Sequence, residues 1–181
     1  MALAATLYHL RIDFSDVDRN VYQDLDLRVA RHPSETARHL MARTLAYCLC
    51  YEDGIAFSQG VSTGEEPAAT IRDGHGILRA WIDVGTPSAE RLHKASKAAP
   101  RVVIFTQHDP ALVQREARSR KIHRVEHIEL FALDAAFLDE AERLSGRNAQ
   151  WGLLHTAGQI YLTVGGRTLS SEVARHELVP V

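Results

Sequence analysis

Acidic side chains are the residues of this sequence best suited to chemistry. The turn at residues 73–76 (DGHG) separates two strand-like runs, residues 67–73 and 78–85. A hairpin folded at this turn places Glu66 opposite Asp83, with the two Cβ atoms about 5 Å apart. Two carboxylates at that separation repel each other, and a divalent cation between them relieves the repulsion. Oxygen ligands of this kind suit Mg²⁺ or Mn²⁺, so the pair predicts a metal site.

A third acid, Glu35, follows from helical periodicity. Pro33 is favoured in a first helical turn, which predicts a helix over residues 33–51. At about 100° per residue, Ala42, Ala46 and Leu49 all lie within roughly 40° of Glu35 on that helix. This small apolar stripe is expected to pack on the sheet, which places Glu35 at the inner edge of the first turn. A carboxylate there is also favoured by the helix dipole.

Each of these acids also has a simpler interpretation. Glu35 could act only as a stabilising charge at the start of its helix. Glu66 and Asp83 could be solvated acids at the ends of two strands. The metal-site hypothesis rests on all three carboxylates converging, and the register between the two strands is inferred.

The pattern along the chain predicts a mixed α/β fold in one domain over residues 1–181. Alternating apolar residues indicate strands, and apolar residues spaced three and four apart indicate helices. The uninterrupted apolar run Val102–Phe105 is typical of a central buried strand. The expected elements are strands at 8–14 and 25–29 forming a hairpin, a helix at 33–51, strands at 55–61, 67–73 and 78–85, a helix at 88–99, a strand at 101–107, a helix at 110–119, a strand at 125–133, a helix at 135–145, and a set of C-terminal strands.

Composition limits the classes of protein to consider. The chain has 181 residues, is 45% hydrophobic and carries a net charge of −2, which indicates a globular protein without a global basic field. No apolar run is long enough to span a membrane, so we expect a cytoplasmic protein with no membrane partner. Cys48 and Cys50 are two residues apart on the expected helix and face different sides, which predicts buried packing rather than a zinc site.

Five segments carry a resemblance to a known family. They are residues 1–3 (MAL), 16–20 (DVDRN), 31–35 (RHPSE), 65–67 (EEP) and 81–85 (WIDVG). With these segments the sequence resembles the YaeQ family of small bacterial proteins over essentially the whole chain. The resemblance implies a restriction-endonuclease-like core similar to the PD-(D/E)xK nucleases, in which a helix, a three-strand meander, a helix and a strand follow one another.

By this resemblance Glu35, Glu66 and Asp83 take the three acidic, metal-binding positions. Those nucleases place a lysine two residues after the last acid, whereas this sequence has Gly85 there. A substitute cation is Lys94, in the second turn of the following helix. Side chains on a helix lean towards its N-terminus, so Lys94 is expected to reach back over the site.

Arg91 and Lys97 are further candidates for the missing cation, and all three could instead be solvated helix charges. If the site is catalytically active, the metal would polarise a phosphodiester and acidify its bound water, and Lys94 would stabilise charge developing on the phosphate. One-metal and two-metal versions both remain open.

A basic segment bears on the partner. It predicts a phosphate-binding patch, although cations at a helix C-terminus are also stabilising by themselves. Two functions therefore stay open: a Mg²⁺- or Mn²⁺-dependent nuclease or phosphodiesterase, and a catalytically silent module of the same fold that binds nucleic acid or a protein. The residues of the segment are Arg115, Arg118, Arg120, Lys121, His123 and Arg124.

Overall fold

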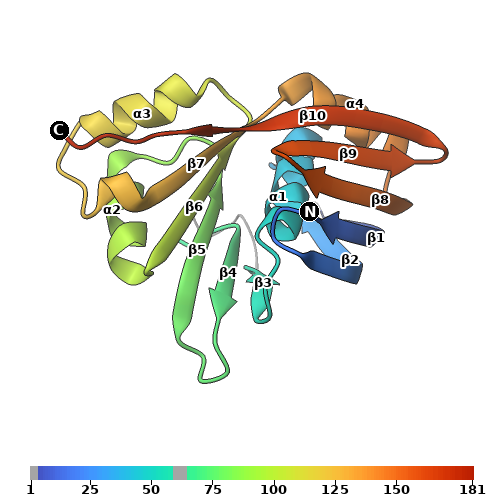
Figure 1. Cartoon of the computed structure of the whole chain (residues 1–181), viewed down its shortest axis with the longest axis horizontal. Helices are drawn as coiled ribbons and strands as arrows, with labels where there is room; N and C mark the ends of the chain where they lie inside the picture. The colour runs from blue at the N-terminus through green and yellow to red at the C-terminus, as the bar shows by residue number, and fades with distance from the viewer. Residues whose placement is uncertain (1–3, 59–64) are drawn as a thin grey trace.

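The computed structural model describes residues 4–58 and 65–181 and confirms the mixed α/β class (Figure 1). One large sheet runs through the molecule, with helices on its faces. The elements are β1 (Thr6–Asp16), β2 (Val21–Arg31), α1 (Ala37–Leu49), β3 (Ile55–Phe57), β4 (Ala69–Arg72), β5 (Leu78–Val84), α2 (Ala89–Ala98), β6 (Arg101–Thr106), α3 (Pro110–Arg118), the 3₁₀ turn η1 (Val125–His127), β7 (Ile128–Leu133), α4 (Ala135–Ser145), β8 (Asn148–Thr156), β9 (Gln159–Val164) and β10 (Arg167–His176).

The sheet has ten strands in the order β2-β1-β8-β9-β10-β7-β6-β5-β4-β3. Strand β10 joins its two halves, because residues 167–172 pair with β9 and residues 173–176 pair with β7. One half therefore contains the N-terminal hairpin and the C-terminal strands, and the other contains the meander β3-β4-β5 with β6 and β7. In the meander half, β5, β6 and β7 are parallel to one another.

Helix α1 lies between the two halves of the sheet (Figure 1). A single apolar core surrounds Leu40 of this helix and draws on both halves. It includes Leu10 of β1 and Trp151 of β8 from one half, and Ile82 of β5 and Phe105 of β6 from the other. The two halves of the sheet thus bury their apolar faces against the same helix.

The predicted apolar stripe of α1 and its cysteines are buried as expected. Ala42, Ala46 and Leu49 all belong to the core around the helix. Cys48 and Cys50 are buried free thiols. Burial raises the pKa of the Cys50 thiol to about 12 and raises the pKa of the Cys48 thiol further. Both are packing residues with little thiolate at neutral pH.

Helix α1 begins at Ala37, later than the sequence pattern predicts. The hydroxyl of Thr36 accepts a hydrogen bond from the backbone N–H of His39 at 3.1 Å, and this cap fixes the first turn. Pro33 lies in a turn before the helix. Glu35 therefore precedes the helix instead of standing in its first turn.

The meander also differs from the expected boundaries. Strand β3 ends at Phe57, and residues 59–61 of the expected strand lie outside the described residues, as do residues 1–3. Strand β4 is shorter than expected, because residues 67 and 68 precede it. No helix in the described ranges is long and apolar enough to cross a membrane.

Candidate functional site

Asp83 lies on β5 with only 6% of its surface exposed, and its carboxylate is occupied by neighbouring donors. The guanidinium of Arg91, on α2, forms an ion pair through Nε and donates from Nη2 to Oδ1 at 3.2 Å. The indole N–H of Trp81 points at Oδ2 from 3.4 Å, and the backbone N–H of Val84 donates to Oδ1 at 3.2 Å. A buried carboxylate held by a guanidinium and two N–H groups has its charge compensated within the protein.

Arg91 contacts two of the four predicted site residues. Its Nη2 donates to the backbone carbonyl of Glu66 at 2.6 Å while it holds Asp83. One turn along α2, Lys94 forms an ion pair with Glu65, the neighbour of Glu66. Asp83 and the Glu66 backbone therefore meet at Arg91, whereas Lys94 pairs with Glu65 and contacts neither of them among the described residues.

The strand register places Glu66 differently from the sequence prediction. The ladder between β4 and β5 pairs Ala69 with Ile82, two residues away from the register that puts Glu66 opposite Asp83. The turn is longer than expected, spanning residues 73–77, and the register shifts between Ile71 and Arg72, at the end of β4 before the turn. Glu66 lies in a bend before β4, with an exposed side chain.

Glu35 is a second buried acid with its own cations. Arg43 binds both carboxylate oxygens, at 2.9 Å and 3.0 Å, and His39 Nδ1 lies 2.8 Å from Oε1. Burial alone raises the pKa of Glu35, but the hydrogen bonds and charges of His39 and Arg43 outweigh it, so the pKa lies below its ordinary value. Glu35 is therefore an ionised carboxylate in the interior.

Glu35 and Asp83 lie on different sides of the sheet. Successive residues of a strand face opposite sides, and Ile82 belongs to the core around α1, whereas Trp81 belongs to a second core with α2 and α3. Asp83 points to the same face of the sheet as Trp81, which packs with α2 and α3. Glu35 is hydrogen-bonded to His39 and Arg43 of α1, which covers the other face. Within residues 4–58 and 65–181, no group of three or more His, Cys, Asp or Glu side chains could hold a metal ion.

The glycine in place of the expected lysine has a structural cause. Gly85 follows β5 with a φ of +108°, a conformation that side chains of L-residues rarely adopt. Its N–H donates to the carbonyl of Phe105 at 2.8 Å, which ties this turn to β6. A lysine at this position would carry backbone strain in this conformation.

The basic segment lies beside α2, next to His93 and Lys97. The backbone N–H of His123 lies 3.3 Å from Nδ1 of His93. The pKa of His93 is lowered, first by partial burial and then by the charges of Lys97, Arg120 and His123. We call these four residues the basic patch. In the described part of the chain, no acidic side chain pairs with Lys97 or Arg120.

The acid within the basic segment does not neutralise this patch. Glu116 instead accepts a hydrogen bond from the backbone N–H of Ala89, at the start of α2, at 3.0 Å. Arg115, Arg118, Lys121 and Arg124 flank the patch along the chain, and they too form no ion pair in the ranges that the structure covers.

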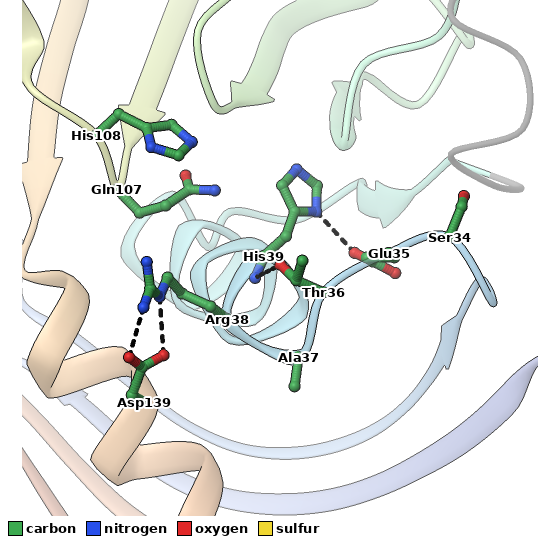
Figure 2. A pocket seen from close by; sticks show the side chains of 9 residues that line it. All are labelled: Ser34, Glu35, Thr36, Ala37, Arg38, His39, Gln107, His108 and Asp139. Carbon is green, nitrogen blue, oxygen red and sulfur yellow. Dashed lines mark hydrogen bonds and ion pairs between the residues drawn. The ribbon is translucent and has the colours of Figure 1, made fainter.

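A cleft at the start of α1 was missed by the sequence analysis (Figure 2). Its volume is about 770 Å³, and we call it the α1 cleft. The missed signal is the pair Gln107-His108 at the carboxyl end of a buried strand, where open α/β sheets commonly bind ligands. The cleft is lined by Ser34, Glu35, Thr36, Ala37, Arg38, His39, Gln107, His108 and Asp139.

Comparison with known proteins identifies relatives across nearly the whole chain. The profile of the family described as YaeQ protein matches residues 1–173. A YaeQ protein of Salmonella typhi is 30% identical over 164 residues, covering 90% of this chain and 91% of its own. The YaeQ protein of Escherichia coli (strain K12) is 38% identical over 111 residues, and this match covers 61% of each chain.

Two solved structures share the fold. The crystal structure of the YaeQ protein from Xanthomonas axonopodis pv. citri superposes with a TM-score of 0.87 and 26% identity, covering 97% of this chain and 99% of its own. That of the YaeQ protein from Pseudomonas syringae gives a TM-score of 0.84 at 24% identity, covering 98% and 97%. From the family profile and these relatives together, the chain belongs to the YaeQ family.

Proposed function

We propose that this protein binds nucleic acid through the basic patch on the side of α2 and α3. The observation that carries the proposal is the absence of acidic partners for Lys97 and Arg120 within the described residues. Surface cations are usually interspersed with acids, whereas a cluster of unpaired cations is the electrostatic footprint of a phosphate-binding surface. Because the whole chain has a net charge of −2, this local concentration of positive charge is distinctive.

The flanking cations extend the surface that phosphates would contact. Arg115 and Arg118 lie on α3, and Lys121 and Arg124 lie in the loop that follows it. Contacts of this kind neutralise phosphates and release counterions, so they give affinity without sequence specificity. We therefore expect binding that depends strongly on salt and weakly on sequence.

Fluorescence anisotropy with labelled single-stranded DNA, double-stranded DNA and RNA tests this proposal. The double variant Lys97→Glu/Arg120→Glu is expected to weaken binding by about tenfold or more and to reduce the slope of log K against log salt by about two. The matched control is Arg11→Glu/Arg28→Glu, which changes the charge equally on exposed positions of the N-terminal hairpin.

Two outcomes would overturn the proposal. One is the absence of binding to any of the three nucleic acids at 50 mM salt, a concentration at which phosphate contacts are strong. The other is an equal loss of affinity in the patch variant and in the hairpin control, because that result would reflect net charge alone.

A second candidate is a metal-dependent nuclease or phosphodiesterase using Mg²⁺ or Mn²⁺. The observation that favours it is that Arg91 holds Asp83 and the Glu66 backbone together, with Lys94 one turn further along α2 and paired with Glu65. As arranged, these residues do not fit a metal ion, since Arg91 and Trp81 occupy the Asp83 carboxylate. Metal binding there requires Arg91 to leave Asp83, and Glu35 lies on the opposite face of the sheet.

Manganese titration followed by calorimetry separates this candidate from a silent binding module. If Asp83 is a ligand, Asp83→Asn abolishes the heat of binding, and Asp139→Asn, an ion-paired acid elsewhere, leaves it unchanged. In a cleavage assay, Lys94→Ala is expected to reduce the rate about a hundredfold, with Arg11→Ala on the N-terminal hairpin as the control, because Lys97 belongs to the basic patch. Wild-type protein that neither binds Mn²⁺ nor cleaves DNA or RNA would eliminate the enzyme candidate.

A further inference from the structure

Gln107 is a buried amide without a hydrogen-bond partner. It lies directly after β6 with 8% of its surface exposed. Its Oε1 is buried and unpartnered, and its side chain forms no hydrogen bond with any described residue. Leaving a buried polar group unsatisfied costs free energy, so such a group points to an unfilled interaction. Figure 2 shows the amide directed towards His39, below the ring of His108.

His39 presents a fixed imidazole to the same cleft. Because an ionised carboxylate only accepts hydrogen bonds, Nδ1 of His39 carries the proton in its 2.8 Å contact with Glu35. Arg43 keeps Glu35 ionised, as its two hydrogen bonds favour the charged form. Nε2 of His39 is left to act as an acceptor or, on protonation, as a donor to a ligand.

The N-terminus of α1 adds backbone donors. The N–H of His39 is taken by the Thr36 hydroxyl, but the N–H groups of Ala37 and Arg38 have no partner among the described residues. A helix of thirteen residues carries partial positive charge at this end, and free N–H groups there favour an anion.

The charged groups around the α1 cleft are otherwise balanced. Arg38 donates to both carboxylate oxygens of Asp139, at 2.8 Å and 2.6 Å, so this acid is already neutralised. Glu35 is neutralised by Arg43 and accepts a hydrogen bond from His39. The imidazole of His108 is exposed and forms no hydrogen bond or ion pair within the described part of the chain. The groups that remain without a partner among the described residues are therefore Nε2 of His39, the imidazole of His108, the Gln107 amide and the helix N–H groups.

We propose that the α1 cleft binds a small molecule that carries a phosphate group. The phosphate lies at the N-terminus of α1, between His39 and His108. Nε2 of Gln107 donates to a phosphate oxygen, and the buried Oε1 accepts from a hydroxyl of the ligand. The cleft volume of about 770 Å³ lies in the range of small-molecule sites and exceeds the size of a lone phosphate. This site is formed by α1 and the residues after β6, and it is separate from the basic patch.

NMR titration of uniformly ¹⁵N-labelled protein tests the proposal with two probes, inorganic phosphate and adenosine monophosphate. Sodium chloride at matched ionic strength is the reference. The expected result is saturable shifts of the amides of Ala37 and Arg38 and of the side-chain amide of Gln107. Saturation by both probes identifies phosphate recognition, and tighter binding of the nucleotide identifies a phosphate ester as the ligand.

Gln107→Leu is expected to weaken phosphate binding by about tenfold, because it removes a donor to a charged group. The melting temperature of this variant should stay equal to that of the wild type or rise, since the buried amide has no partner to lose. If Gln107 had a purely structural role, Gln107→Leu would instead lower the melting temperature and leave the affinity for phosphate unchanged. Gln23→Leu, at an exposed position of β2, is the control.

His108→Ala is expected to reduce affinity for both probes by about tenfold, while His75→Ala, an exposed histidine in the turn before β5, leaves it unchanged. Shifts confined to other surfaces, or shifts that survive both Gln107→Leu and His108→Ala, would overturn the proposal. The nucleic-acid proposal is tested separately, because these variants leave Lys97 and Arg120 intact.

Discussion

Glu35 and Asp83 are carboxylates with less than a tenth of their surface exposed, and an arginine of the same chain lies against each. A buried charge needs such a partner, since removal from water costs several kcal/mol. The same pairing limits chemistry, because Arg43 and Arg91 occupy the oxygens that a metal ion would take. The reactivity that acidic residues suggest in a sequence therefore depends on which cations the fold places beside them.

Replacing Glu35 with Gln is expected to destabilise the protein by about 3 kcal/mol at pH 7, because the buried guanidinium of Arg43 loses its counter-charge. The pKa of Glu35 is lower in the folded protein than in the unfolded chain. Its stabilising effect is therefore fully present above the unfolded pKa of about 4.3 and is lost as the pH falls through the folded pKa.

Urea unfolding of wild type and Glu35→Gln at pH 3 to 7 measures this effect. The difference in free energy of unfolding should be constant from pH 6 to 7 and shrink below pH 4. Glu52→Gln, at an exposed position, should match the wild type throughout. A difference that stays the same down to pH 3 would show that the charge of Glu35 does not stabilise the fold.

Among the elements, those whose two faces differ most were predictable from the sequence. Alternation from Tyr8 to Phe14 predicted β1 because one face is buried and the other is not. The start of α1 was predicted too early because Pro33 suits a turn as well as a first helical turn, and the cap at Thr36 decides between them. The register of Glu66 depended on turn length and a bulge, which periodicity does not encode.

The candidate site was predictable only in part, for a related reason. The residue types of Glu35 and Asp83 were evident, but their partners Arg43 and Arg91 come from contacts between elements. The α1 cleft likewise brings Gln107, from the end of β6, to His39 on α1. Contacts between residues far apart in sequence leave no periodic signal. The metal site was therefore predicted from the acids alone, without the arginines that occupy the carboxylate oxygens in the folded protein.

The backbone conformation of the turn that ends β5 can be tested at Gly85. Gly85→Lys restores the residue that the nuclease pattern expects, and we predict that it costs about 1 to 2 kcal/mol of stability. The cause is the φ of +108° alone, since a Cβ built on Gly85 meets no atom within 4 Å.

Gly74→Lys is the matched control, because it too has open space around a Cβ but no positive φ. Thermal unfolding should place this control within about 0.5 kcal/mol of the wild type. Equal stability of both variants would mean that the backbone at Gly85 adapts to a side chain, and the departure from the nuclease pattern would then need another cause.

The whole molecule is a single sheet whose halves share one helix. Strand β10 pairs with β9 and then with β7, and the core around α1 takes side chains from both halves. A second core lies between the meander half and helices α2 and α3. Ile82 and Trp81 are neighbours on β5 and belong to different cores. Loss of β5 would therefore remove packing from both cores at once, which favours cooperative unfolding.

Each core contains one of the two tryptophans, so the chain carries its own pair of probes. Trp151 belongs to the core around α1, and Trp81 belongs to the core with α2 and α3. In Trp81→Phe and in Trp151→Phe, the remaining tryptophan reports one core, while far-UV circular dichroism reports all helices and strands.

We predict that fluorescence and circular dichroism give the same urea midpoint within each variant, as two-state unfolding requires. The two variants are expected to differ from each other in midpoint, because each removes a different buried contact. Should fluorescence of Trp81 change at a lower urea concentration than circular dichroism, the α2–α3 side would unfold as a separate unit, and the shared helix would not couple the two cores.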